Sequence, residues 1–457
     1  MLKQFRLPVL LIVFIPIISS CKLMPKDDEK KGDDSSRVDG HPAWIMQGNV
    51  YEVNVRQYTP EGTLVAFERS LDRLKNMGVQ TLWFMPLNPI SKKDRKGPLG
   101  SYYAVSDYRA FNPEFGTIDD WKSFVKKAHE MGFKVIIDWV PNHTGADHVW
   151  ITTHPAFYVK DSTGQPAIPF GWDDTRQLDY TNMEMQDSMI ASMKYWMTAS
   201  DIDGFRCDVA WNVPGSFWKK CTDELKKIKK DLFMLAEGDK NYLHASGFDA
   251  TYPWEMFHKM VDIAKGMAPA FALDSVKRHY DTLYPKNALE LYFTSNHDEN
   301  SWNKADYGTM PGAIHAPFAV FTQTMYHSIP LIYSGQEEPF LDSVRFFYKD
   351  TITFHDYKRE KFYRTLLNLR RDNPALASNA SFKKISVGND KALYAYVREA
   401  GGKKVFVILN LSAAEQTIKV TDADLHGEPY NVFMGNKEKL DDRDWNIEPW
   451  GYVIYTY

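Results

Sequence analysis

Eight short apolar runs, spaced between residues 45 and 380 and separated by amphipathic stretches, constrain the fold of this chain more than any other feature. Each run has the length of a buried strand. The stretches between them, such as 64–77 and 119–131, carry apolar residues at three- and four-residue steps, which predicts helices. Strands that alternate with helices predict parallel βα units, and eight units fit one closed barrel. The expected strands are 50–56, 79–85, 134–139, 204–208, 232–237, 248–252, 289–294 and 330–334.

Two segments depart from this alternation. Residues 144–181 form a connection that is too long for a plain βα loop and contains Pro, Gly and Trp, so they predict a small inserted subdomain after the third strand. From residue 381 to residue 457 the pattern becomes an alternation of apolar and polar residues, as in 392–398 and 404–410. This alternation predicts a C-terminal antiparallel β domain.

The N-terminus has the pattern of a targeting segment and is set apart from the fold. Lys3 and Arg6 precede an apolar stretch, and Ile18-Ser-Ser-Cys21 then resembles the lipobox of bacterial lipoprotein signal peptides. The alternative is an uncleaved membrane helix. It is disfavoured because about 14 apolar or small residues, at ~1.5 Å each, span only ~21 Å of a hydrocarbon core about 30 Å thick.

We therefore expect residues 1–21 to be a signal peptide that ends at a lipidated Cys21. Residues 22–44, which are polar and without periodicity, are expected to form a flexible tether. The protein would then be a cell-envelope lipoprotein, held at a membrane without spanning it. Lys22 directly follows the lipidated cysteine, and by resemblance this residue favours the outer membrane. The protein would then lie at the periplasmic face of that membrane or at the cell surface.

The charge balance disfavours nucleic acid as a partner and makes a neutral polymer the more natural substrate. Lys and Arg total 55 against 59 Asp and Glu, and the two signs are interspersed. The sequence contains no Gly-rich phosphate loop, so no organic cofactor is expected. Cys207 and Cys221 lack the paired spacing of a zinc site, so we expect buried free thiols, with a disulfide between them as the alternative.

Three carboxylates, Asp208, Glu237 and Asp298, stand at the ends of the fourth, fifth and seventh expected strands. In a parallel barrel, catalytic groups gather at the carboxyl ends of the strands. Cleaving a glycosidic bond takes one acid that protonates the leaving oxygen and one carboxylate that attacks or stabilises the oxocarbenium-like centre. The three positions therefore predict glycoside chemistry, and solvated loop carboxylates are the alternative.

Arg206 is expected to divide the roles of these acids. It lies two residues before Asp208 in the same strand, so both side chains point to one face. Its positive charge is expected to lower the pKa of Asp208 and to keep that carboxylate ionised. Glu237, which faces other acids, is expected to stay protonated and to serve as the acid.

The strand ends resemble, in chain order, the signature segments of the alpha-amylase family of glycoside hydrolases. The four segments that carry the resemblance are Ile137-Asp-Trp-Val-Pro-Asn-His143, Gly204-Phe-Arg-Cys-Asp208, Ala236-Glu237 and Ser295-Asn-His-Asp298. Segments 103–108, 178–179 and 330–336 are similar to further parts of the family pattern. The resemblance covers residues 45–457 and implies a (β/α)8 TIM barrel, a subdomain inserted after strand three and a C-terminal β-sandwich.

The resemblance also implies a role for each site residue. Asp208 would be the nucleophile, Glu237 the general acid and base, and Asp298 a carboxylate that holds sugar hydroxyls. His143 and His297 would hydrogen-bond the hydroxyls of the sugar beside the cleaved bond, and Tyr103 would stack on its face. Asp138 would orient Arg206. Ordinary core packing is the alternative for the histidines and the tyrosine. Trp139 and Trp211 are further candidates for substrate contact.

One departure from the family pattern bears on metal binding. After Asp208 this chain reads Val209-Ala-Trp-Asn212, where many alpha-amylases carry a Lys-His pair that shapes the leaving-group subsite and a calcium site. By resemblance Asn142 is an expected calcium ligand. A calcium ion needs six to eight oxygen ligands, and the sequence does not supply the others plainly.

Three functions compete at this point. The resemblance implies a retaining hydrolase that cleaves α-1,4-glucosidic bonds in starch or maltodextrin through a covalent glycosyl-enzyme. A cyclodextrinase, a neopullulanase-like enzyme or a transglycosylating enzyme would use the same acids on a different substrate or acceptor. A surface glycan-binding lipoprotein without catalysis is the third reading, and the three intact acids disfavour it.

Overall fold

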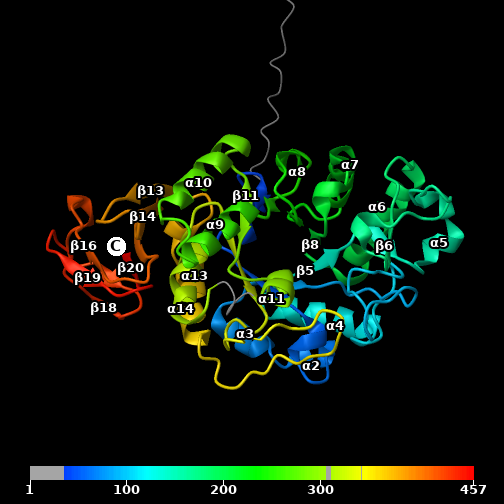
Figure 1. The fold of residues 1–457 in the computed structure, drawn as a ribbon, viewed down its shortest axis with the longest axis horizontal. Helices are drawn as coiled ribbons and strands as arrows, with labels where there is room; N and C mark the ends of the chain where they lie inside the picture. Colours follow the sequence, from blue (N-terminus) through cyan, green and yellow to red (C-terminus); the bar gives the residue numbers. More distant parts are fainter. Residues whose placement is uncertain (1–34, 305–309, 341) are drawn as a thin grey trace, which may run out of the picture. The chain divides into compact units, whose positions relative to one another are not determined.

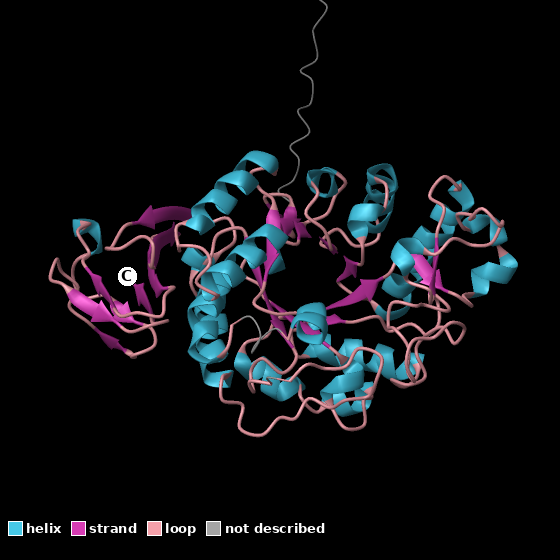
Figure 2. Ribbon diagram, viewed as in Figure 1, coloured by secondary structure: helices cyan, strands magenta, loops and turns pink. Residues whose placement is uncertain are grey.

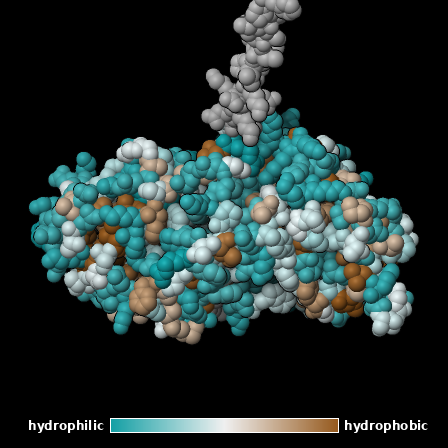
Figure 3. Space-filling model, turned by 90° about the horizontal axis from the view of Figure 1, so that it is seen from above, coloured by the Kyte–Doolittle hydropathy of each residue, from teal (hydrophilic) through white to brown (hydrophobic). Residues whose placement is uncertain are grey.

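The computed structural model describes residues 35–304, 310–340 and 342–457. The expected signal peptide, Cys21 and the tether up to residue 34 lie outside the described residues. The last part of the expected tether is folded instead: β1 (Arg37–Val38) pairs antiparallel with β2 (His41–Pro42), and Arg37 forms an ion pair with Asp249 (2.8 Å). Within the described ranges no helix has both the length and the apolar character needed to cross a membrane. In the space-filling view of Figure 3, hydrophilic residues dominate the visible face, and hydrophobic residues form separate patches.

A closed barrel of eight parallel strands confirms the expected architecture (Figure 2). The last strand pairs with the first through Leu331 and Val50, which closes the ring. Helices lie around the strands (Figure 1). The strands are β3 (Val50–Val53), β4 (Thr81–Phe84), β5 (Lys134–Trp139), β8 (Gly204–Cys207), β9 (Phe233–Ala236), β10 (Ala250–Thr251), β11 (Leu289–Tyr292) and β12 (Ser328–Tyr333).

The first expected strand, 50–56, is shorter in the structure. It ends at Val53, because the side chain of Asn54 turns to Tyr333 and Tyr102 (3.1 Å each) and the chain then enters a short helix. All four residues of that helix are buried, so the apolar run could not distinguish strand from helix.

The helices follow from amphipathic patterning and capping. In α4 the apolar residues Trp121, Phe124, Val125 and Ala128 are buried, and Thr117 forms a reciprocal capping box with Asp120. The helices are α1 (Val55–Tyr58), α2 (Leu64–Glu68), α3 (Leu71–Met77), α4 (Ile118–Glu130), α5 (Val149–Thr153), α6 (Met183–Ser200), α7 (Gly215–Lys226), α8 (Asn241–Ala245), α9 (Trp254–Ala264), α10 (Ala272–Leu283), α11 (His297–Asn303), α13 (His315–Thr324) and α14 (Glu360–Asp372).

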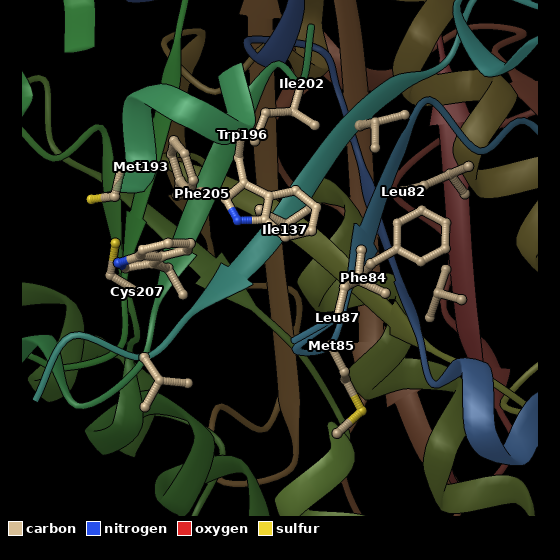
Figure 4. Close-up of a cluster of buried hydrophobic side chains, with 14 of the residues drawn as sticks. Leu82, Phe84, Met85, Leu87, Ile137, Met193, Trp196, Ile202, Phe205 and Cys207 are labelled. Atoms are coloured by element: carbon tan, nitrogen blue, oxygen red, sulfur yellow. The ribbon is translucent and has the colours of Figure 1, made fainter. Parts of the chain in front are cut away.

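Apolar side chains of β4, β5 and β8 share one buried cluster with those of α6 (Figure 4). Phe84, Ile137 and Phe205 from the strands and Trp196 from the helix are all buried. Trp196 also donates its indole N–H to the carbonyl of Tyr108 (2.7 Å), so the helix is fixed by a hydrogen bond as well as by burial. Truncating a buried tryptophan of this kind to alanine costs about 3–5 kcal/mol.

Gly204 lets β8 and β9 approach each other closely. A Cβ atom at this position would lie 2.1 Å from the carbonyl oxygen of Phe233 in β9, which no side chain tolerates. Because Asp208 and Glu237 follow directly after these two strands, Gly204 sets the spacing of the two acids.

The segment between β5 and α6 forms a small subdomain, as the sequence predicts. Its β6 (His143–Gly145) pairs antiparallel with β7 (Thr175–Gln177), and α5 lies between them in the chain. The first residue of this subdomain strand is His143, so the insertion reaches the catalytic end of the barrel.

The C-terminal residues form the expected antiparallel domain, which begins at Ser381. One sheet has six strands in the order β13-β14-β15-β20-β17-β18, and β16 pairs with β19 in a second. Apolar side chains from both sheets share one core. The strands are β13 (Ser381–Ile385), β14 (Leu393–Ala400), β15 (Lys403–Asn410), β16 (Gln416–Ile418), β17 (Tyr430–Asn431), β18 (Asn436–Lys437), β19 (Trp445–Ile447) and β20 (Tyr452–Thr456).

Two fully buried arginines lie where the barrel meets this domain. Arg370 of α14 donates to the carbonyl of Ser328 (2.6 Å), at the start of the closing strand β12. Arg398 of β14 donates to the carbonyls of Thr324 and Ala377 (2.6 Å each). Both side chains therefore donate to main-chain acceptors at the junction; the carbonyl of Ser328 also accepts from Ser378 and that of Ala377 from the N–H of Ala380.

Candidate active site

The three acids predicted from the sequence come together at the carboxyl end of the barrel. Asp208 directly follows β8, Glu237 directly follows β9, and Asp298 lies in the first turn of α11, after β11. Their side chains are 10%, 13% and 37% exposed, so a substrate at this end can reach all three. The fold thus places the acids where a parallel barrel puts its chemistry.

Arg206 connects the acids to one another. Its Nη1 lies 3.0 Å from Oδ1 of Asp208 and 3.0 Å from Oδ1 of Asp138, and its Nη2 lies 3.1 Å from Oε1 of Glu237. The β5–β8 register sets Asp138 directly beside Arg206, as the sequence analysis expected. The guanidinium is fully buried and also donates to the hydroxyl of Tyr252 (3.2 Å). One positive charge is therefore shared by three carboxylates.

Arg206 lowers the pKa of Asp208 as expected, but the expected net result, a lowered pKa for this carboxyl, is wrong. Burial raises the pKa of Asp208 well above its usual range, the charge of Glu237 raises it further, and Arg206 only opposes these effects. Burial likewise raises the pKa of Asp138 to about 6, against Arg206. The physical reason is that a single guanidinium, shared among three acids, cannot compensate for the burial of Asp208 and Asp138.

Val209 holds the second oxygen of Glu237. Its backbone N–H donates to Oε2 of Glu237 (2.7 Å), and its φ of 45° lies in the left-handed region, which is strained for a β-branched residue. Strain of this kind persists only where the surrounding structure enforces it. Here it turns the peptide that follows Asp208 toward Glu237, so the two acids are positioned through one short stretch of chain.

His297 is held as a cation between two carboxylates. Its Nδ1 lies 2.5 Å from Oε1 of Glu52 and its Nε2 lies 3.3 Å from Oδ2 of Asp298. Burial alone would lower the pKa of His297, but Asp298 and Glu52 raise it well above its usual value. In turn, although burial would raise the pKa of Asp298, His297 lowers it. Asp298 is thereby kept as a carboxylate.

Glu52 is a site residue that the sequence analysis missed. It lies in the middle of β3 and is completely buried. The signal was present, since a charged residue inside an otherwise apolar strand needs a buried partner. That partner, His297, is 245 positions away in the chain.

Tyr103 connects the carboxylates around Arg206 to the ion pairs of His297. Its hydroxyl donates to Oδ2 of Asp138 (3.0 Å) and lies 2.8 Å from Nε2 of His297. Its ring is nearly parallel to that of His297, with centroids 5.5 Å apart. The structure thus brings Tyr103 to the acids, and its stacking on a sugar stays a prediction.

His143 lies at the edge of the site and differs from His297 in charge. Its side chain is buried, and burial lowers its pKa to about 3, so the imidazole is neutral near neutral pH. Its Nδ1 lies 3.0 Å from Nδ2 of Asn142, and its ring meets the edge of Trp172 at 5.4 Å. A neutral imidazole suits hydrogen bonding to a sugar hydroxyl.

The surroundings of Asn142 bear on the expected calcium ligand. Its Oδ1 accepts hydrogen bonds from Nδ2 of Asn212 (2.8 Å) and from Nε2 of Gln177 (3.2 Å). Across the described ranges, no group of three or more His, Cys, Asp and Glu side chains could hold a metal ion. The oxygen that calcium would take already faces two N–H donors, so these residues, as arranged, do not fit a calcium ion.

The two tryptophans expected to contact substrate differ in exposure. Trp139 is completely buried, donates to the sulfur of Met189 (3.2 Å) and stacks on Tyr108, so its expected contact with substrate is wrong. Its side chain alternates away from that of Asp138 onto the outer face of β5. Trp211, which follows Asp208 by three residues, is exposed and available to a ligand.

Exposed aromatic rings flank the acids on two sides. Phe170 and Trp172 of the subdomain lie 4.9 Å apart, and Phe170 lies 5.5 Å from Trp211. On the side of Asp298, Trp302 of α11 lies 5.4 Å from Phe346. Phe170 and the three tryptophans are between 37% and 56% exposed. Sugar rings stack well on exposed aromatic rings of this kind.

Comparison with known proteins agrees with this geometry. The model of the alpha-amylase catalytic domain matches residues 30–175 and 159–392. The chain belongs to the alpha-amylase family. Residues 393–454 match the C-terminal domain of the alpha-amylase SusG. This alpha-amylase family member is therefore a glycoside hydrolase by descent, and its acids stand at the positions that the family signatures imply.

Three relatives represent the range of named activities. The chain is similar to alpha-amylase MalA of Haloarcula japonica, at 27% identity over 82% of this chain and 57% of that protein. It is 24% identical to a cyclomaltodextrinase of Thermoanaerobacter pseudethanolicus, over 79% of this chain and 66% of that protein. A maltogenic alpha-amylase, AmyB of Thermotoga neapolitana, superposes with a TM-score of 0.82 at 27% identity, over 91% of this chain and 99% of that one.

The two cysteines after Cys21 are free and buried, as expected. Cys207 lies in β8 and its thiol is surrounded by apolar side chains of the barrel wall (Figure 4). Burial raises the pKa of both thiols, which keeps them protonated and unreactive.

Proposed function

We propose that this protein is a retaining hydrolase that cleaves α-1,4-glucosidic bonds in starch, maltodextrin or related α-glucans. The observation that carries the proposal is the Arg206 guanidinium, which contacts Asp208 through one nitrogen and Glu237 through the other. A nucleophile and an acid that share one counter-ion lie close together, as a double displacement requires.

In this mechanism Asp208 attacks the anomeric carbon while Glu237 gives its proton to the leaving oxygen. Glu237 then takes a proton from the water that hydrolyses the glycosyl-enzyme. Asp298, kept ionised by His297, is placed to bind sugar hydroxyls and to balance the positive charge that develops on the ring. Val209 holds one oxygen of Glu237 in a hydrogen bond and Arg206 lies 3.1 Å from the other, so both oxygens of the acid are held in place.

A second candidate keeps the same chemistry and changes the substrate. Trp211 stands where many alpha-amylases have a residue of the Lys-His pair, and its exposed ring lies close to Phe170 of the subdomain. An aromatic wall of this kind favours acceptor sugars over water, or a curved glucan. The names of the cyclomaltodextrinase and maltogenic relatives support this alternative, whereas a binding-only protein would have no need for the paired acids.

Chromatography of the products from amylose, pullulan and a cyclodextrin tests the proposal. An α-1,4 hydrolase should release linear oligosaccharides from amylose and act slowly on the other two. Faster cleavage of the cyclodextrin or of pullulan would favour the second candidate. The Asp208→Ala variant serves as the control, because it should release no product from any of the three while keeping its fold.

We further propose that the enzyme is anchored to the cell envelope through lipidated Cys21, at the outer membrane. The lipobox-like sequence before Cys21 supports this location. The polar stretch that follows Cys21 and precedes β1 would act as a tether and let the catalytic barrel reach an insoluble or polymeric glucan while the lipid stays in the membrane.

A further inference from the structure

A buried carboxyl group that the glycosidase chemistry does not use lies on the outer side of the barrel. Glu290 is the second residue of β11 and is 4% exposed. Its Oε2 accepts a hydrogen bond from the hydroxyl of Tyr292 (3.1 Å). Within the described part of the chain its Oε1 has no hydrogen-bond partner. A buried polar atom without a partner is rare and needs an explanation.

This carboxyl group lines a cavity of about 250 Å³ between β11, the start of β12 and helix α10. Four tyrosines contribute to its wall: Tyr280, Tyr284, Tyr292 and Tyr326. The rings of Tyr280 and Tyr284 are stacked 5.2 Å apart. We call this space the tyrosine cavity. It is large enough for a compact organic molecule and is separate from the catalytic acids.

The walls of the tyrosine cavity already accommodate a positive charge. The ammonium group of Lys277 lies 4.7 Å from the ring centre of Tyr326 and forms an ion pair with Asp281 (2.5 Å). Tyrosine faces attract cations through the negative charge of the ring, more strongly when water is excluded. Asp281 is thereby neutralised by Lys277, and Glu290 is the acidic group that is left to pair with an incoming cation.

We propose that the tyrosine cavity binds a small primary ammonium compound. Its N–H groups would donate to Oε1 of Glu290, and the four tyrosine rings would surround its carbon atoms. A primary ammonium fits better than a quaternary one, because the Glu290 oxygen lacks a donor and a quaternary ammonium has no N–H. A hard metal ion fits worse, since it needs several oxygen ligands in a fixed geometry.

The state of Glu290 agrees with this assignment. Burial raises the pKa of Glu290 to about 8, so an isolated carboxyl in this cavity holds its proton near neutral pH. The approach of an ammonium group would favour the carboxylate, and the proton would leave to solvent. Charge is then buried only when it is paired.

Binding can be measured by thermal melting and calorimetry with ethanolamine hydrochloride at constant ionic strength. The wild-type protein should melt at a higher temperature as ethanolamine increases, because a ligand that binds only the folded state stabilises it. Tetramethylammonium and maltose should give much smaller shifts. Glu290→Gln should weaken ethanolamine binding ~10-fold or more, the factor expected for a charge-assisted hydrogen bond.

Glu130→Gln, which changes an exposed carboxylate on α4, is the matched control and should bind ethanolamine as the wild type does. If Glu290→Gln does not fold, the wild-type titrations decide alone. No saturable ethanolamine signal, or equal shifts with tetramethylammonium or maltose, would overturn the proposal. Starch hydrolysis is not part of this readout, so the outcome is independent of the proposed enzymatic function.

Discussion

Replacing Glu237 by glutamine removes the transferable proton while keeping the size of the side chain. In the wild type, Oε2 of Glu237 accepts a hydrogen bond from the N–H of Val209 (2.7 Å), and Oε1 forms an ion pair with Nη2 of Arg206 (3.1 Å). Glutamine has only one acceptor oxygen, so one of the two donors would face the amide NH2. Losing one hydrogen bond to a charged group costs about 1.5–3 kcal/mol, which should appear as a lower melting temperature.

The effect on catalysis should be larger and should depend on the leaving group. General acid catalysis contributes ~10²–10⁴ in rate, or about 2.7–5.4 kcal/mol at 1.36 kcal/mol per tenfold change. A glucan needs this proton because a sugar alkoxide leaves poorly. A maltoside with an acidic phenol as leaving group does not, so Glu237→Gln should lose less than ~10-fold on that substrate.

The assay compares kcat/KM of wild type and Glu237→Gln on maltotetraose and on such an aryl maltoside. Glu299→Gln, which removes a neighbouring carboxylate that bonds Asn303 rather than Arg206, is the charge control and should change both substrates little. Equal losses on the two substrates would refute the assignment of Glu237 as the acid. A melting temperature that does not fall would refute the account of its hydrogen bond to Val209 and its ion pair with Arg206.

Four further predictions test other parts of the reading. If Asp208 is the nucleophile, proton NMR should detect the α-anomer before mutarotation, and initial release of the β-anomer would overturn that role. The raised pKa of His297 stabilises the fold fully below its unfolded value of ~6.5, and this contribution is lost as pH rises through the folded pKa. The stability advantage of wild type over Glu52→Gln in urea should therefore shrink as the pH rises above ~6.5, and a constant gap would contradict the buried ion pair. Because two amide donors occupy the oxygen of Asn142, EDTA should leave the melting temperature unchanged, and a fall that calcium reverses would show a metal site. Cys21→Ala should move the protein from the membrane to the soluble fraction without changing the rate of the purified enzyme, and equal fatty-acid labelling of both forms would exclude lipidation.

The sequence was sufficient for the barrel and for the positions of the acids, because strand ends are local features. The pairing of Arg206 with Asp138 depends on the register of neighbouring strands, which the family signatures imply. The pKa of Asp208 could not be predicted in the same way, since its direction depends on how many acids share one guanidinium and how deeply they are buried. Trp139 shows the same limit, because the period of a strand gives two faces but does not tell which face meets the core.

The buried arginines at the domain junction limit how this architecture can be rearranged. Arg398 belongs to the β domain, yet the carbonyls of Thr324 and Ala377 that it satisfies belong to the barrel side of the chain. Cutting the chain before Ser381 would remove the Arg398 donor from the carbonyl of Thr324 and one of the two donors from the carbonyl of Ala377, which also accepts from the N–H of Ala380. A replacement β domain from another protein would therefore have to bring a donor to the same place to restore these contacts.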